Sequence, residues 1–210
     1  MTDPDHGHKQ ATTSRVEAFS DGVMAIAITL LVLNLHVPSS AEVDAAGGLF
    51  TALAHNWPAY VAYLASFVTI GIIWLNHHAL IETIATFDWT LHWLNLLLLL
   101  GVATLPFSTA LMAEYVAEGG INASVSAAIY GGLALVMALP WSLMWIHLRD
   151  NPRLLDQGFD SAHASQALRR NIFGPLIYGA AALVAFVAPM VSLALYALIA
   201  AFFAGVRQAD

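Results

Sequence analysis

Long apolar runs separated by short polar segments dominate the chain. The first run begins at Arg15 and reaches His36, which is about the length of roughly 20 residues that an α-helix needs to cross a bilayer. Later apolar runs predict further helices over residues 57–81, 91–112, 123–147, 172–188 and 190–206. The last two runs are together too long for one span, and Pro189 between them predicts a tight helical hairpin. The pattern therefore predicts an all-α integral membrane protein with six transmembrane helices.

The polar segments predict the remaining organisation. Residues 1–14 are polar and predict a disordered tail, followed by one transmembrane domain over residues 15–207. The expected connections are residues 38–48, 82–89, 114–122 and 149–170, of which the last is the longest. The tail lacks the basic region, short apolar core and cleavage site of a signal peptide, so we expect the first helix to stay in the mature protein.

The positions of Lys and Arg predict the orientation of the spans. Lys9 and Arg15 precede the first helix, four arginines lie within residues 149–170, and Arg207 follows the sixth helix. With six spans, all these residues lie on one side of the membrane, and Lys and Arg concentrate on the cytoplasmic side. We therefore expect both termini to be cytoplasmic, in a multi-pass protein of the cell membrane.

The composition and the absence of certain motifs argue against several classes of function. Hydrophobic residues make up 59% of the chain, charged residues 10%, and the formal net charge is -7, which argues against a nucleic-acid partner. Cysteine is absent, so disulfides and thiolate metal sites are excluded. His77 and His78 are adjacent and point about 100° apart on a helix, so they do not form a paired metal site. The chain also lacks the common hydrolase motifs, and we expect neither an enzyme nor a metal centre.

The first helix carries the most informative residues. Ile26, Leu30 and Leu33 recur at helical spacing and form an aliphatic stripe, with Thr29 beside it. Asp21 points away from this stripe, toward whatever packs behind the helix, because successive residues are rotated by about 100°. A closed ring of such helices would form a narrow apolar constriction, of the kind that gates ions by excluding water.

Other interpretations of these residues stay open at this point. Aliphatic residues at this spacing in a membrane helix are commonly ordinary packing or lipid-facing positions. Asp21 fits a structural role, accepting hydrogen bonds from the helix that carries Trp74 and His77. It also fits a proton- or cation-coupled transporter in which Asp21 titrates. An accessory membrane protein without conductance is a third class.

The segment Arg15-x-x-x-Phe19-Ser20-Asp21-Gly22, with Ile26, Thr29 and Leu30, closely resembles the first-helix signature of the transmembrane-protein-175 family. This family comprises the lysosomal potassium channels and their bacterial relatives. The resemblance extends to Trp74-x-x-His77-His78 on the second helix.

The resemblance implies a bacterial single-repeat form, a homotetramer whose first helices line a potassium-permeable pore without a carbonyl filter. It implies Ile26 as the main constriction, Leu30 and Leu33 as further layers, and Thr29 as the position linked to ion selectivity. It also implies a network that holds the first helix, made of Arg15, Phe19, Ser20, Asp21, Trp74 and His77. The implied partners are other copies of the chain, membrane lipid, and K⁺ with other monovalent cations or protons as permeant ions; no cofactor is implied.

Overall fold

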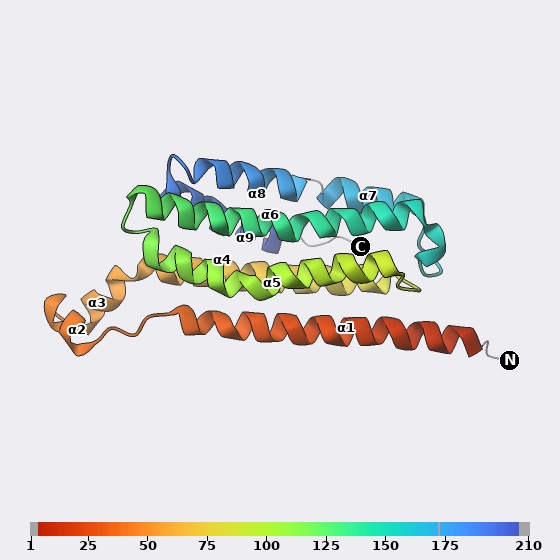
Figure 1. Cartoon of the computed structure of the whole chain (residues 1–210), viewed down its shortest axis with the longest axis horizontal. Coiled ribbons are helices and arrows are strands. Elements are labelled where there is room, and N and C mark those ends of the chain that lie inside the picture. The colour runs from red at the N-terminus through yellow and green to blue at the C-terminus, as the bar shows by residue number, and fades with distance from the viewer. Residues whose placement is uncertain (1–3, 172, 206–210) are drawn as a thin grey trace.

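Long helices running along one common axis build the molecule (Figure 1), which is described here from a computed structural model. The structure describes the backbone of residues 4–171 and 173–205, and the side chains of residues 13–169 and 175–201. The elements are α1 (Pro4–Leu30), η1 (Leu31–Asn34), α2 (Ser40–Ala45), α3 (Leu49–His55), α4 (Trp57–Glu82), α5 (Trp89–Tyr115), α6 (Gly120–Asp150), η2 (Pro152–Leu154), α7 (Ser161–Asn171), α8 (Phe173–Val184) and α9 (Pro189–Gly205).

The helices predicted from the apolar runs are all present, and the described chain is all-helical apart from its connections and one isolated bridge. Within the described residues, four helices are long and apolar enough to span a membrane, whereas α8 and α9 are shorter apolar helices. The fold is therefore an all-α membrane architecture. The predicted division into a tail over residues 1–14 and a domain over residues 15–207 stays a prediction, although α1 already begins at Pro4.

Two connections predicted as loops contain helices. The segment after the first span forms α2, whose N-terminus is closed by a capping box between Ser39 and Glu42. The long connection over residues 149–170 contains η2 and α7, and α7 precedes α8 along the same side of α6 (Figure 1). Helix α2 is short and helix α7 is polar, so the spacing of apolar residues in the sequence did not predict them.

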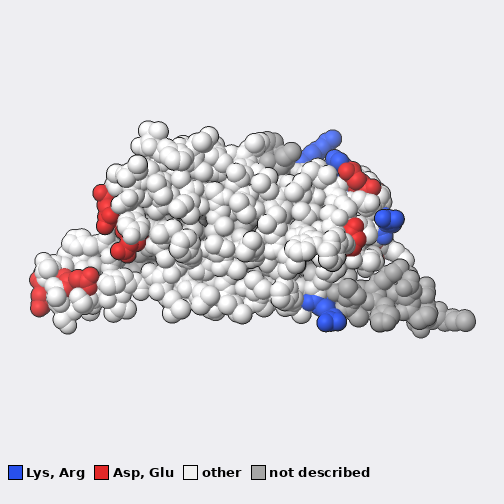
Figure 2. Space-filling model, viewed as in Figure 1, with Lys and Arg blue, Asp and Glu red and all other residues white. Residues whose placement is uncertain are grey.

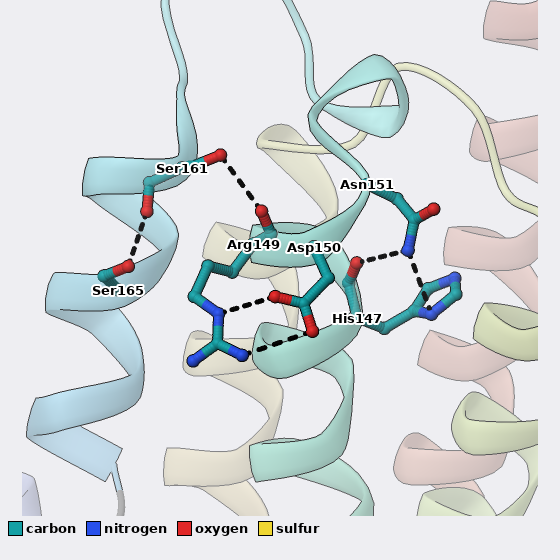
Figure 3. Close-up of polar contacts among 6 residues, drawn as sticks. All are labelled: His147, Arg149, Asp150, Asn151, Ser161 and Ser165. Atoms are coloured by element: carbon teal, nitrogen blue, oxygen red, sulfur yellow. Dashed lines mark hydrogen bonds and ion pairs between the residues drawn. The ribbon is translucent and has the colours of Figure 1, made fainter.

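Polar contacts at the end of α6 explain why the 149–170 connection is ordered. Figure 3 shows Ser161 at the start of α7 donating to the backbone carbonyl of Arg149 across 3.0 Å. The Arg149 side chain pairs with Asp150, and Asn151 donates to the carbonyl of His147 across 2.9 Å. The Ser161 and Asn151 contacts satisfy carbonyls that a helix C-terminus leaves without intrahelical partners, and the Ser161 contact also joins α7 to α6.

A second set of contacts joins this region to the turn before α5. Asp88 caps α5 by accepting from the backbone N–H of Leu91, and its other oxygen lies 2.7 Å from Nε2 of His147. Although burial raises the pKa of Asp88, these hydrogen bonds outweigh it, and the pKa lies below its ordinary value. The backbone N–H of Ala85 also donates to the carbonyl of Leu154. One end of the bundle is thus held by polar contacts between its connections.

Candidate pore-lining surface and its anchors

Helix α1 lies at the edge of the bundle and is the least covered of the long apolar helices (Figure 1). In its most apolar stretch 22% of the residues are buried, compared with 39% to 50% in α4, α5 and α6. One stripe of α1, continued by η1, packs inward on α4 and α5, and its members recur at helical spacing: Ser20, Met24 and Ala27 on α1 and Leu31 on η1. Among the residues that the structure describes, the opposite side of α1 is largely exposed.

The predicted aliphatic stripe lies on this open side. Ile26 is 62% exposed, Leu33 is 75% exposed, and Leu30 is exposed as well. Thr29 is also exposed, and its hydroxyl donates to the carbonyls of Ala25 and Ile26 at 3.0 and 2.9 Å. Since the hydroxyl proton is used within the helix, the hydroxyl oxygen can still accept a hydrogen bond. The side chains that the sequence analysis predicts for the gate (Ile26, Leu30 and Leu33) and for ion selectivity (Thr29) therefore share one exposed surface.

Asp21 lies on the other side of α1 and contacts α4. The indole nitrogen of Trp74 donates to Oδ1 of Asp21 across 3.0 Å. The half-buried carboxylate thus has the partner that the sequence analysis predicted for a structural role. One turn earlier, Glu17 Oε1 lies 2.7 Å from Nδ1 of His78, a second contact between α1 and α4 that the sequence analysis missed.

A buried hydrogen-bonded chain connects α1 to both α5 and α4. The side-chain amide of Asn95 donates to the hydroxyl of Ser20 across 3.0 Å. Nε2 of His77 lies 2.8 Å from Oδ1 of Asn95, so the imidazole donates to the amide oxygen. All three side chains are buried. Asn95 was missed because a single polar residue in the predicted helix over residues 91–112 gives no motif; its position within an otherwise leucine-rich run was the available signal.

Arg15 and Phe19, the remaining members of the predicted network, are exposed in the single chain. Their role in holding α1 stays a prediction.

At the far end, beyond α1, the side-chain amide of Asn34 donates to the carbonyl of Pro106 across 2.8 Å. His36, two residues after η1, pairs with Glu42 of α2. The helix and its extension are therefore anchored on both sides of the aliphatic stripe.

Charges are distributed unevenly along the bundle axis. On the face drawn in Figure 2, Lys and Arg side chains lie toward the end where α1 begins, and the opposite end carries acidic side chains without basic ones. A broad band between the two ends has no charged side chains on this face. Such a band is expected of helices that cross hydrocarbon, where an ionised group is costly.

The fold and this surface define a class: an all-helical integral membrane protein in which one span, anchored from behind, presents an uncovered aliphatic face. Comparison with known proteins specifies the family. The family model described as the endosomal/lysosomal potassium channel TMEM175 matches residues 15–106. A potassium channel of Streptomyces collinus is 42% identical over 91% of this chain and 91% of its own length. A potassium channel of Chamaesiphon minutus is 39% identical over 93% of this chain and 95% of its own length.

The crystal structure of a lysosomal potassium-selective channel TMEM175 homologue from Chamaesiphon minutus has the same fold. It superposes with a TM-score of 0.84 at 36% identity, covering 95% of this chain and 100% of the solved one. The chain belongs to the TMEM175 family. This confirms the resemblance carried by the first helix, and it assigns the chain to a family of ion channels rather than enzymes.

Proposed function

We propose that this chain is the subunit of a potassium-permeable cation channel in which α1 lines the pore. The observation that carries the proposal is the exposure of Ile26, Leu30 and Leu33 on the least covered span, together with Thr29. Membership of a family whose relatives are named potassium channels supports it. Such a channel needs no cofactor, because permeation is passive.

A pore of this kind requires several copies of the chain. One copy offers a single aliphatic face, whereas four copies around an axis would surround a narrow path with Ile26 as the tightest ring. A homotetramer would also cover the exposed side of α1. The contacts of Ser20, Asp21 and Asn34 behind the helix support this arrangement, because they leave the stripe free to face an axis.

A ring of aliphatic side chains is an obstacle to the passage of a hydrated cation. Ile26 side chains offer no ligands to replace the water around a cation, so a closed ring excludes ions by excluding water. Conduction then requires a wider ring through which a partly hydrated ion passes. Potassium holds its water less tightly than sodium, and the Thr29 oxygens one turn away would compensate part of the loss. Leu30 and Leu33 would form further apolar layers.

We propose six spans with both termini on the cytoplasmic side of the cell membrane. The alignment of α7 and α8 along α6, followed by α9, supports a fifth and sixth pass even though α8 alone is short. The end of the bundle rich in Lys and Arg would then be cytoplasmic. Residues 15–207 would form the channel domain, in contact with membrane lipid, and residues 1–14 its cytoplasmic tail.

The test is potassium flux into liposomes containing the purified protein, with and without Ile26→Asn. We expect passive flux that prefers potassium to sodium and rises several-fold in the variant, because an amide wets the constriction. Leu100→Asn is the matched control: Leu100 is 62% exposed, as Ile26 is, but lies on α5. Equal flux in the wild type and Ile26→Asn, or the same rise in Leu100→Asn, would contradict the assignment of the gate.

The same preparation separates a channel from a transporter coupled through Asp21. A transporter that uses this carboxylate stops when it no longer titrates, so Asp21→Asn would abolish uptake. A channel whose Asp21 only anchors α1 to Trp74 keeps passive flux in whatever Asp21→Asn protein assembles. Loss of flux in correctly assembled Asp21→Asn protein would favour the transporter.

A further inference from the structure

The C-terminal end of α1 continues as a more tightly wound segment. After Leu30 the chain forms η1, a 3₁₀ segment over Leu31–Asn34, and the backbone becomes extended at Leu35. Segments of this kind have poorer hydrogen-bond geometry than an α-helix and rarely run longer than about four residues. Contacts with other helices are therefore needed to hold η1 in this form.

Two side chains of η1 hold it against the bundle. Leu31 is fully buried, and the side-chain amide of Asn34 donates to the backbone carbonyl of Pro106 across 2.8 Å. In a 3₁₀ segment, residues three apart lie directly above one another, so Leu31 and Asn34 share the inward side. The segment packs on both α4 and α5. Asn34 therefore ties η1 to α5 by a directional bond.

The carbonyl that receives this bond lies at an interruption of α5. Pro106 stands inside α5 and has no N–H, so a carbonyl of the preceding turn loses its helical donor. Next to it, the hydroxyls of Ser108 and Thr109 both donate to the carbonyl of Leu105, at 3.0 and 2.8 Å. Polar side chains commonly bond backbone groups near a proline in a membrane helix. The Asn34 contact differs in that its donor comes from another element.

The winding of η1 decides the direction of Leu33. With 3₁₀ winding Leu33 lies directly over Leu30, whereas α-helical winding would rotate it by about 60° from that line. Both side chains are exposed on the same side of the chain, as this stacking requires. Because Asn34 holds η1 from the opposite side, its hydrogen bond and the direction of Leu33 are linked.

We propose that Asn34 is a positioning residue for the Leu33 layer of the pore. Its bond to the Pro106 carbonyl keeps η1 in the 3₁₀ form, and this form keeps Leu33 in line with Leu30. Without the bond, the segment relaxes toward the more stable α-helical winding and Leu33 turns off the axis. The effect on conduction rests on the proposed function, but the effect of Asn34 on the direction of Leu33 does not.

The experiment measures the reactivity of single thiols, because the chain contains no cysteine. Leu33→Cys and Leu30→Cys are reconstituted into liposomes, each with and without Asn34→Leu, and their reaction with a cationic methanethiosulfonate is followed by mass spectrometry. We expect Asn34→Leu to slow the reaction at residue 33 several-fold, because the thiol turns away from the water at the pore mouth. The rate at residue 30, which precedes η1, should not change. Asn34→Gln keeps an amide donor and should restore part of the rate.

Asn122→Leu is the matched control, because it makes the same change at an exposed position of α6. It should alter neither rate. Equal rates at residue 33 with and without Asn34→Leu, or no reaction at residue 33 at all, would overturn the proposal. The same change of rate at residues 30 and 33 would also overturn it, because α1 would then move as a whole.

Potassium flux separates positioning from a merely structural contact. We expect Asn34→Leu to raise passive flux several-fold, and to have no further effect once Leu33→Ala has removed the layer. Unchanged flux in Asn34→Leu, or a further rise in the double variant, would overturn the link between Asn34 and conduction. If Ile26→Asn still raises the flux in that case, only this inference fails. If no variant conducts, the proposed function fails, and the thiol rates decide whether Asn34 positions Leu33.

Discussion

The indole nitrogen of Trp74 lies 3.0 Å from Oδ1 of Asp21, on the side of α1 opposite the aliphatic stripe. A carboxylate of the first span is thereby used to hold the helix in place. We expect Trp74→Phe, Asp21→Ala and the double variant to reveal a coupling of about 1 kcal/mol in a double-mutant cycle, measured by denaturant unfolding in detergent. Additive effects of the two single changes would contradict the contact. We also expect Asp21→Ala to reduce the yield of assembled protein more than the conductance of what assembles.

Asn95 joins Ser20 to His77, so its removal should destabilise the packing of α1 strongly. Asn95→Leu leaves two buried polar groups without their partner, which costs about 1–3 kcal/mol of unfolding free energy. Thermal unfolding in detergent measures the loss. Asn122→Leu is the control, because Asn122 is exposed at the start of α6. Equal melting temperatures for the two variants would refute a role for the buried chain.

Thr29 should affect selectivity without affecting stability. Its hydroxyl is exposed and bonds only its own helix among the contacts described. We expect Thr29→Ala to lower the potassium-to-sodium permeability ratio, because the oxygen that faces the ion is lost, and Thr29→Ser to retain the ratio. Bi-ionic reversal potentials in planar bilayers measure it. A ratio in Thr29→Ala equal to that of the wild type would remove Thr29 from ion selection.

Gly131 permits the close packing of α6 against α8 and α9. A Cβ at this position would overlap the hydroxyl of Tyr196 and approach the Cβ of Ala182. We therefore expect Gly131→Ala to lower the unfolding free energy by about 1–3 kcal/mol through overpacking. Gly132→Ala is the control: the space beside Gly132 is open, and alanine favours the helix by about 1 kcal/mol. Destabilisation by both changes to a similar degree would argue against this packing.

The lowered pKa of Glu42 leads us to expect that acid destabilises α2, the helix after the first span. Its carboxylate accepts from the backbone N–H of Ser39, and with the Ser39 hydroxyl and His36 this lowers the pKa of Glu42 from 4.5 to about 2. Because the folded pKa is the lower one, the stabilisation is complete above about pH 4.5 and is lost as the pH falls toward 2.

Hydrogen exchange of α2 amides, corrected for intrinsic rates, measures this effect. We expect constant protection from pH 7 down to about 4.5 and a progressive loss below it. Glu42→Gln should show the reduced protection already at pH 7, whereas Asp44→Asn should behave as the wild type. Protection in Glu42→Gln that matches the wild type at pH 7 would show that the charge of the Glu42 carboxylate does not stabilise α2.

The apolar runs predicted the long helices well because hydrophobic segments of bilayer length are local features of a sequence. The helix predicted over residues 57–81 is α4, and the run predicted over residues 91–112 lies within α5. Helices α2, α3 and α7 were missed, since they are short or polar and depend on caps and neighbours. Ser161 stabilises the start of α7 only because the end of α6 lies beside it.

The sequence by itself determined the class of protein, the motif on the first helix, and the opposition of Asp21 to Ile26, because these follow from composition and helical periodicity. Only the tertiary structure decided which groups Ser20, Glu17 and Asn34 meet: Asn95, His78 and the carbonyl of Pro106. These partners are separated by 61 to 75 positions, and no local pattern selects among the polar residues available. The choice is made when the helices pack, because polar groups within a membrane domain are stable only where they find one another.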